Sequence, residues 1–136
     1  MGKGNIKTLL CFLMLTLLTS AYAQQKSESV KKENNNLTVL VKYKSQPEKE
    51  GEVLAALNAL ILEVKKEPYF VNIKMLVDPA DKTNILLYEE WSDETYYKGD
   101  HMNTKHLQKF IGDSRNFLAG PPEISFWELN SNYNLD

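Results

Sequence analysis

The sequence lacks most of the residues and motifs that build the common catalytic and nucleic-acid-binding sites. It has one cysteine, Cys11, and only two histidines, and it contains no glycine-rich phosphate loop, dinucleotide fingerprint or nucleophile elbow. Its 16 basic and 18 acidic residues give a formal net charge of −2, without the basic patch typical of nucleic-acid-binding proteins. We therefore expect neither a cofactor nor a nucleic-acid partner.

The amino terminus has the pattern of an export signal. Residues 1–8 are short and basic, Leu9–Leu18 is almost unbroken in its apolar character, and Ala21-Tyr22-Ala23 matches a signal-peptidase site. The apolar run is too short to cross a membrane, which takes about 20 residues. We expect a cleaved signal peptide over residues 1–23, an exported protein (periplasmic or secreted) and no stable membrane insertion.

Cleavage would leave a chain without cysteine, so its stability would depend on its core and on a partner subunit rather than on disulfides. Removing Lys3 and Lys7 from the 16 basic residues leaves 14 against 18 acidic ones, a formal charge of −4. Residues 24–36 are polar and aperiodic, which is typical of a flexible linker. Residues 37–129 suit one folded domain, and residues 130–136 form a C-terminal tail.

Hydrophobic periodicity in residues 37–129 predicts alternating strands and helices. Strands are expected at residues 37–43, 69–77, 84–91 and 124–129. A helix follows the first strand, with an apolar stripe from Val53 to Val64, a capping box formed by Ser45 and Glu48, and a stop at Pro68. A short helix begins at Ser92 and a further one at Thr104. The order β-α-β-β-α-β, with the second helix split, predicts a ferredoxin-like α+β sandwich.

The two histidines do not have the spacing of a helical metal site. His101 and His106 are five residues apart, so on one continuous helix they would point about 140° away from each other. A helical metal site favours a spacing of four residues. We therefore expect no metal site.

Aromatic and imidazole side chains gather around the end of the third strand. Tyr97 and His101 are four residues apart and can share one helix face, which Trp91 can also reach. An imidazole that titrates near neutrality could accept a proton from a phenol or hydroquinone. His106 follows Thr104 in the first turn of a helix, where the positive helix end favours a neutral ring.

These features give a set of candidate site residues. The candidate catalytic residues are Tyr97, His101 and His106. The candidate substrate-binding residues are Tyr43, Tyr88, Trp91 and Phe110. The alternative interpretation is that the aromatic residues only pack in the core and that His106 only occupies a helix start.

Residues 37–129 also resemble the antibiotic biosynthesis monooxygenase domain. The resemblance depends on the order and spacing of several short segments. They are Pro47-Glu48-Lys49, Glu67-Pro68, Asp78-Pro79, Tyr88-Glu89-Glu90-Trp91, His101, Thr104, His106 and Gly120-Pro121-Pro122. It implies a dimeric α+β barrel, in which two copies form a homodimer and each pocket lies between a subunit's own sheet and helices. In cofactor-free members a Trp and a Tyr six residues later line the site, matching Trp91 and Tyr97; in haem-degrading relatives a Trp and a His ten residues later match Trp91 and His101.

The chain departs from the family pattern at several positions. Glu67-Pro68-Tyr69-Phe70 stands where the family often has Glu-Pro-Gly-Cys, so we expect a different turn and pocket floor. Thr104-Lys105-His106 replaces Thr-Pro-His, and Leu87 stands where some members have Asn. The first-strand Asn of the haem-degrading branch is absent.

We interpret the chain as a cofactor-independent monooxygenase that acts on a quinol or polyphenolic aromatic substrate with molecular oxygen. A second hypothesis is a dimer that binds or degrades haem or a hydrophobic metabolite. A third is a non-oxidative isomerase of a small metabolite.

Overall fold

The computed structural model describes residues 36–133. The expected signal peptide and nearly all of the expected linker therefore lie outside the described residues. The elements, in chain order, are β1 (Leu37–Lys44), α2 (Glu50–Val64), β2 (Phe70–Val77), β3 (Asn84–Trp91), α3 (Glu94–Lys98), the 3-10 helix η1 (His101–Asn103), α4 (Lys105–Ser114) and β4 (Glu123–Glu128).

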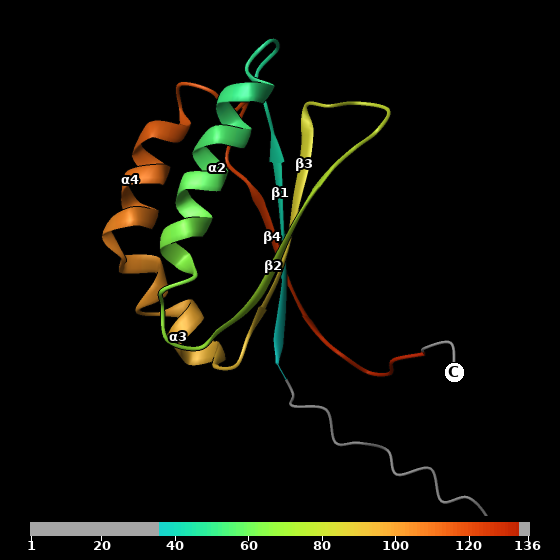
Figure 1. The fold of residues 1–136 in the computed structure, drawn as a ribbon, viewed down its shortest axis with the longest axis vertical. Coiled ribbons are helices and arrows are strands. Elements are labelled where there is room, and N and C mark those ends of the chain that lie inside the picture. Colours follow the sequence, from blue (N-terminus) through green and yellow to red (C-terminus); the bar gives the residue numbers. More distant parts are fainter. Residues whose placement is uncertain (1–35, 134–136) are drawn as a thin grey trace, which may run out of the picture. The chain divides into compact units, whose positions relative to one another are not determined.

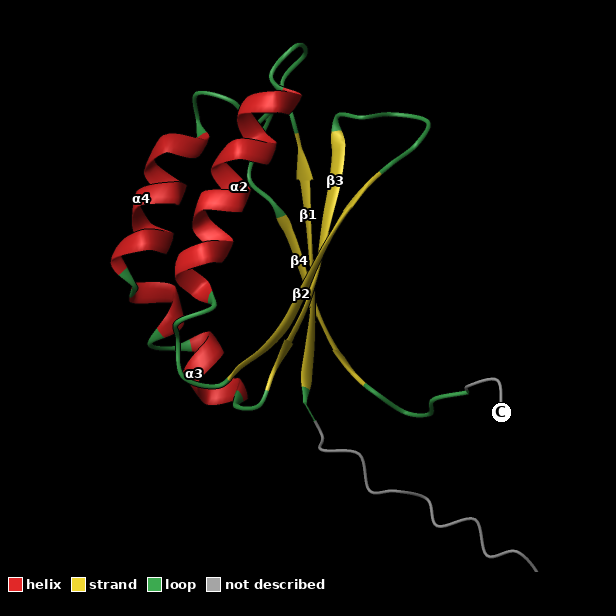
Figure 2. Cartoon of the chain, in the orientation of Figure 1, coloured by secondary structure: helices red, strands yellow, loops and turns green. Residues whose placement is uncertain are grey.

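The strands form one antiparallel sheet in the order β2-β3-β1-β4, and the helices lie on one of its faces (Figures 1 and 2). This arrangement confirms the ferredoxin-like α+β fold with a split second helix. The opposite face of the sheet, which we call the outer face, is not covered by any helix of residues 36–133 (Figure 1). In the described part of the chain, no helix is long and apolar enough to cross a membrane.

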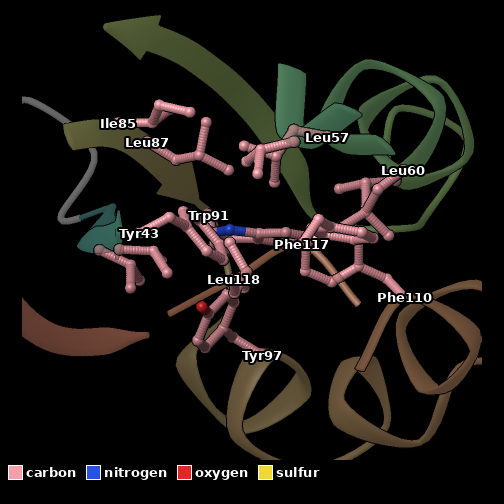
Figure 3. Close-up of a cluster of buried hydrophobic side chains, with 14 of the residues drawn as sticks. Tyr43, Leu57, Leu60, Ile85, Leu87, Trp91, Tyr97, Phe110, Phe117 and Leu118 are labelled. Carbon is pink, nitrogen blue, oxygen red and sulfur yellow. The ribbon is translucent and has the colours of Figure 1, made fainter. Parts of the chain in front are cut away.

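The hydrophobic core lies between the helices and the inner face of the sheet, and Figure 3 shows part of it. Alternation along β1 and β3 turns every second side chain toward the helices, as strand geometry requires. Val53 and Leu57 of α2, both completely buried, pack against that face. Burial of aliphatic side chains of this size contributes about 1.5 to 3 kcal/mol each relative to exposure.

The start of α2 differs from the sequence prediction. Ser45 and Glu48 do not form a capping box: the Ser45 hydroxyl donates to the carbonyl of Gln46, and the N-cap residue Lys49 makes no side-chain capping bond. Glu48 has a φ of 64°, in the left-handed region. This conformation turns the chain before α2 begins and prevents the helical geometry that a capping box requires.

The break within the second helix has a local cause at each end. Asp93 caps α3 by accepting a hydrogen bond from the Tyr96 amide at 2.6 Å. Thr104 is extended (φ −64°, ψ 145°), which separates η1 from α4. His101 and His106 therefore lie on two different elements, and the 140° separation expected for one continuous helix does not apply.

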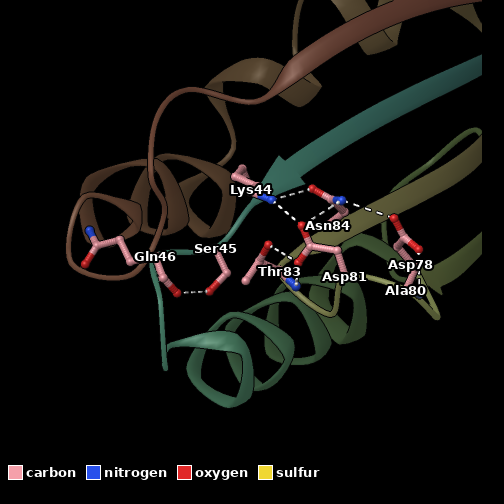
Figure 4. Close-up of polar contacts among 8 residues, drawn as sticks. All are labelled: Lys44, Ser45, Gln46, Asp78, Ala80, Asp81, Thr83 and Asn84. Carbon is pink, nitrogen blue, oxygen red and sulfur yellow. Dashed lines mark hydrogen bonds and ion pairs between the residues drawn. The ribbon is translucent and has the colours of Figure 1, made fainter.

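The connection between β2 and β3 is tied to the end of β1 by side-chain hydrogen bonds (Figure 4). Lys44 donates to Asp81 at 2.7 Å and to Asn84 at 2.9 Å, and the Asn84 amide donates to Asp78 at 3.1 Å. The hydrogen bond from Lys44 contributes most to lowering the pKa of Asp81 to about 2. These bonds fix the connection between β2 and β3.

Candidate active site

Trp91, Tyr97 and His101 come together behind the end of β3. The Trp91 and His101 ring centroids are 4.7 Å apart, and the stacked Tyr97 and His101 rings are 4.8 Å apart. All three are buried, with exposed fractions of 0%, 4% and 5%. The rings pack on one another, and they line neither of the two cavities described below.

An open pocket lies beside this cluster, between the inner face of the sheet and α4. Its volume is about 590 Å³, within the range of small-molecule sites. Two predicted substrate-binding residues, Tyr43 of β1 and Phe110 of α4, line it, and their rings meet edge to face with centroids 5.9 Å apart. The other lining residues are Gln46, Met102, Leu107, Ile111, Ser114, Arg115, Leu118, Ala119, Gly120, Pro121, Pro122 and Ile124. We call this cavity the Tyr43 pocket.

Tyr88 does not lie in the Tyr43 pocket. Side chains alternate along β3, so Leu87 and Glu89 turn inward and Tyr88 turns to the outer face. There its hydroxyl donates to Glu90 at 2.7 Å, and the Lys74 ammonium lies 5.2 Å from its ring centroid. The sequence-based placement of Tyr88 with the other candidate residues is therefore wrong.

Glu67, in the connection between α2 and β2, joins both histidines. Its side chain is 6% exposed and contacts Nδ1 of His101 at 2.8 Å and Nε2 of His106. The Tyr96 hydroxyl donates to the same carboxylate at 3.0 Å. An ionised carboxylate only accepts hydrogen bonds, so both imidazoles donate an N–H to Glu67. Nε2 of a neutral His101 is then the nitrogen that can accept a proton.

His106 lies apart from the Tyr43 pocket. It occupies the first turn of α4, as expected, but it lines a separate groove of about 360 Å³ between α2 and α4, together with Glu63 and Lys109. His101 and His106 therefore face different surroundings, and only their shared partner Glu67 connects them.

Glu89 is a second buried carboxylate, 6% exposed, on the inner face of β3. It accepts a hydrogen bond from the Trp91 indole at 3.0 Å. Burial raises the pKa of Glu89 to about 7, against the lowering effect of the indole bond. Burial, and then the charge of Glu89, raise the pKa values of Tyr43 and Tyr97 well above the ordinary phenol value. Both phenols therefore remain protonated donors at neutral pH.

Sequence reasoning did not find Glu67, Glu89 or Tyr96 as site residues. Glu89 could have been found, because a carboxylate two residues before Trp91 must share its inward face. Glu67 and Tyr96 had no such signal, because only the three-dimensional fold brings them to the histidines. Among residues 36–133, no group of three or more His, Cys, Asp or Glu side chains is arranged to hold a metal ion.

The turn after Pro68 keeps a conformation that glycine would favour. Tyr69 has a φ of 67°, and its carbonyl accepts hydrogen bonds from the amide and hydroxyl of Ser92. The sequence departure from Gly to Tyr therefore leaves Tyr69 in a left-handed, strained conformation. The ring of Tyr69 packs on Tyr96, with centroids 5.2 Å apart.

Comparison with known proteins shows the family to which this chain belongs. A family model described as antibiotic biosynthesis monooxygenase matches residues 36–113, more than half of the chain. This chain belongs to the antibiotic biosynthesis monooxygenase family. The family supports a general monooxygenase-like function.

Individual members of the antibiotic biosynthesis monooxygenase family and related proteins are distant in sequence. YcnE of Bacillus subtilis (strain 168), provisionally named a monooxygenase, is 26% identical over 95 residues, covering 69% of this chain and 99% of YcnE. The uncharacterized protein sll1783 of Synechocystis sp. is 24% identical over 127 residues, covering 93% of this chain and 86% of sll1783. The crystal structure of PA3566 from Pseudomonas aeruginosa superposes with a TM-score of 0.65 at 20% identity, over 71% of this chain and 96% of PA3566. At that identity, the superposition shows the fold alone.

The antibiotic biosynthesis monooxygenase match includes the buried groups but not the whole pocket. It spans Glu67, Glu89, Trp91 and His101 and ends at residue 113. Most of the residues that line the Tyr43 pocket come after this point, from Ser114 to Ile124.

Proposed function

We propose that this protein is a cofactor-independent monooxygenase that oxidises a quinol or polyphenol in the Tyr43 pocket. The observation that carries the proposal is the position of Tyr43. Its ring lines an apolar pocket of about 590 Å³, while the buried carboxylate of Glu89 is close enough to raise the pKa of its phenol. A planar substrate could thus contact apolar walls and a phenol that lies near a proton acceptor.

The substrate would contact Tyr43 and Phe110, which meet edge to face at the pocket wall. Aromatic rings favour edge-to-face and offset contacts, so a planar guest fits such a wall. Trp91 and Tyr97 are buried behind the wall, so their proposed role is to support it and to hold Glu89 rather than to stack on the substrate.

The first chemical step would be loss of a proton from the bound quinol. Tyr43, which lines the pocket, would take the proton from the substrate hydroxyl as its own proton passes to Glu89, which is buried behind the pocket wall. A general base is most effective when its pKa lies near the working pH, and that of Glu89 is about 7. His101, whose Nδ1 contacts Glu67, is buried and does not line the pocket, so it would affect this step through its packing on Trp91 and Tyr97.

The substrate itself would supply the electrons. The quinol anion transfers one electron to O₂, and the resulting semiquinone and superoxide combine to form a carbon–oxygen bond. Cleavage of the O–O bond leaves one oxygen atom on the ring and releases the other as water. For a simple hydroquinone, C₆H₆O₂ and O₂ give the hydroxyquinone C₆H₄O₃ and H₂O, so neither flavin nor metal is required.

On this proposal the protein acts outside the cytoplasm, in line with the signal peptide expected from the sequence. It also forms a homodimer through the outer face of its sheet. That face carries apolar side chains without a helix to cover them. Leu76 and Trp127 there are 50% and 56% exposed. Apolar surface of this kind on a sheet indicates a protein interface.

Oxygen uptake tests the function directly. Metal-stripped protein is mixed with a panel of hydroquinones, and the wild type is compared with Glu89→Gln, His101→Gln and Tyr88→Phe. We expect loss of uptake in the first variant, partial loss in the second and none in the Tyr88→Phe control, whose hydroxyl lies on the outer face. Uptake that Glu89→Gln leaves unchanged would remove Glu89 as the base, and no uptake by the wild type would end the monooxygenase proposal.

A non-catalytic dimer that binds an aromatic metabolite is the second candidate. The close packing of Trp91, Tyr97 and His101 favours it, because buried rings can serve as a core without doing chemistry. Stoichiometric binding of quinols without oxygen uptake would support this candidate.

A further inference from the structure

The lining of the Tyr43 pocket carries one positive charge and no negative charge, in contrast to the net negative charge of the chain. The chain has 18 acidic residues and a net charge of −2, yet no Asp or Glu lines the pocket. Its only charged lining residue is Arg115, which is also the only arginine in the sequence. The other lining residues are mainly apolar, and they come from β1 and the residue pair after it, η1, α4, the segment between α4 and β4, and β4.

Arg115 has no ion pair among residues 36–133, since all the ion pairs found there involve lysine or histidine. Asp113, the acid nearest to it in sequence, pairs with Lys109 at 2.5 Å. The carboxyl end of α4 offers Arg115 only the partial negative charge of a helix end. A guanidinium that is always charged therefore retains its capacity to bind an anion.

The backbone at Arg115 is held in place. The Gln46 side-chain amide donates to the carbonyl of Arg115 at 3.2 Å and to that of Leu118 at 2.9 Å. The backbone N–H of Gln46 also donates to the carbonyl of Phe117 at 2.9 Å. These three bonds tie the segment after α4 to the end of β1, which carries Tyr43. The backbone that carries Arg115 is thus fixed beside Tyr43, and both residues line one pocket.

We propose that Arg115 selects substrates that bear a carboxylate, so that the ligand of the Tyr43 pocket is a hydroxylated aromatic acid. The ring system would lie against Phe110 and Tyr43, and the carboxylate would pair with the guanidinium at the rim. Arg matches the planar geometry of a carboxylate with two parallel hydrogen bonds, which a neutral quinol cannot accept in the same way. The inference rests on the proposed function for the choice of a phenolic ring.

Calorimetry without oxygen tests the inference separately from turnover. The ligands are matched pairs of dihydroxyaryl acids and their methyl esters, beginning with gentisate and methyl gentisate and extending to two- and three-ring analogues. The proteins are the wild type, Arg115→Gln, Arg115→Lys and Lys65→Gln, which removes an exposed cation outside the pocket. Circular dichroism and thermal unfolding confirm that each variant folds.

We expect the wild type to prefer at least one acid over its ester, and this preference to weaken with added salt. Arg115→Gln should lower affinity for that acid about tenfold to a hundredfold, as loss of a charge-assisted hydrogen bond would, and leave the ester within about twofold. Arg115→Lys should show an intermediate loss, and Lys65→Gln none. Equal loss for acid and ester, no loss for the acid, or a wild type without acid preference would each overturn the inference.

The two proposals fail in different ways. Acid binding that depends on Arg115 without oxygen uptake would leave the inference standing and remove the monooxygenase. Oxygen uptake with hydroquinones, together with acid binding that Arg115→Gln does not weaken, would leave the monooxygenase standing and remove the inference.

Discussion

Burial of the Glu89 carboxylate lowers the stability of the fold, and the same residue has a proposed role in proton transfer. Its carboxyl lies on the inner face of β3, where burial disfavours its charged form, and the Trp91 indole supplies the one hydrogen bond recorded for it. A buried carboxylate is retained at a cost in stability, which is more readily explained by a role in proton transfer than by packing.

Replacing Glu89 by Gln should remove a pH dependence of stability. The pKa of Glu89 is about 7 in the folded state, above its ordinary value of 4.5, so the folded state binds more protons between these pH values. The free energy of unfolding should therefore fall as pH rises through this window, by up to about 3 kcal/mol once Glu89 is ionised. Glu89→Gln should not show this fall and should exceed the wild type in stability above pH 7.

Urea unfolding at intervals from pH 4 to pH 8 measures the effect. Glu128→Gln, on the exposed part of β4, serves as the control and should follow the wild-type slope. A slope in Glu89→Gln that equals that of the wild type would show that Glu89 titrates normally.

Substitutions at Tyr69 should show the backbone strain of its left-handed conformation as a difference in stability. Both Tyr69→Ala and Tyr69→Gly lose the contact with Tyr96, so the difference between them reports the backbone alone. The glycine variant should be more stable than the alanine variant by about 1 kcal/mol. At Lys74, in a regular part of β2, the order should reverse, with glycine the less stable of the two. Thermal unfolding of the four variants gives the comparison, and the same order at both positions would contradict the strain.

The sequence carries information on which face of a strand a side chain occupies, but not on the backbone conformation of a turn. Alternation along β3 is a local property, and applying it would have placed Trp91 and Glu89 on the inner face and Tyr88 on the outer face. The sequence prediction instead grouped Tyr88 with Trp91 and did not include Glu89. A left-handed turn at Tyr69 was not foreseen, because the sequence shows that glycine is missing but not whether the backbone conformation is kept.

At the scale of elements, a single connection holds the split second helix in place. Glu67 follows α2 and reaches both η1 and α4 through the two histidines, and α3 through Tyr96. Three elements that share few other polar contacts are thus joined at one buried carboxylate. The position of His101 depends on this junction.

Glu67→Gln should weaken the hydrogen bonds at this junction, because the side chain keeps nearly the same size but loses a carboxylate oxygen. An amide presents one acceptor oxygen where the carboxylate presents two, so at least one of the three donors loses its partner. The free energy of unfolding should fall by about 1 to 3 kcal/mol. Nitrogen chemical shifts of the imidazoles should also show a change in the His101 tautomer, which a general loss of packing would not produce.

Glu63→Gln is the matched control for this variant. Glu63 lies in α2 and pairs with the exposed Lys66, so its loss should leave the free energy of unfolding nearly unchanged. Unchanged His101 shifts in Glu67→Gln would show that Glu67 does not set the tautomer.

Element order and type were predictable, whereas the ends of the helices were not. The apolar stripe of α2 and the alternation of the strands depend on burial, which a sequence shows through its periodicity. The start of α2 depends on the backbone conformation of Glu48, and the break at Thr104 on packing between elements. The convergence of the two histidines on Glu67 followed from that break, so no local pattern could predict it.

At the scale of the whole molecule, the sheet has one face covered by helices and one face open. The open face carries Leu86 and Tyr88 of β3 beside Leu40 and Lys42 of β1. An open apolar sheet face is a place where a second copy can pack, and the proposed homodimer uses it.

A charge on this face should separate the proposed dimer. Leu86→Glu places a carboxylate at the centre of the outer face, where burial against a second sheet would be costly. Light scattering after size exclusion should change from a dimer mass to a monomer mass, with an unchanged circular dichroism spectrum. Leu62→Glu, on the exposed side of α2, should leave the mass unchanged. A monomeric wild type, or a dimer that persists in Leu86→Glu, would contradict the assembly.

The wall of the Tyr43 pocket is built largely by residues from Ser114 to Ile124, which run from the end of α4 to the start of β4, beyond the family match. Most of this segment lies between the last helix and the last strand, so it can change in length and composition while the scaffold stays the same. Two members of the family could thus have the same proton acceptor and still bind different ligands. Ligand choice would then diversify faster than the reaction itself.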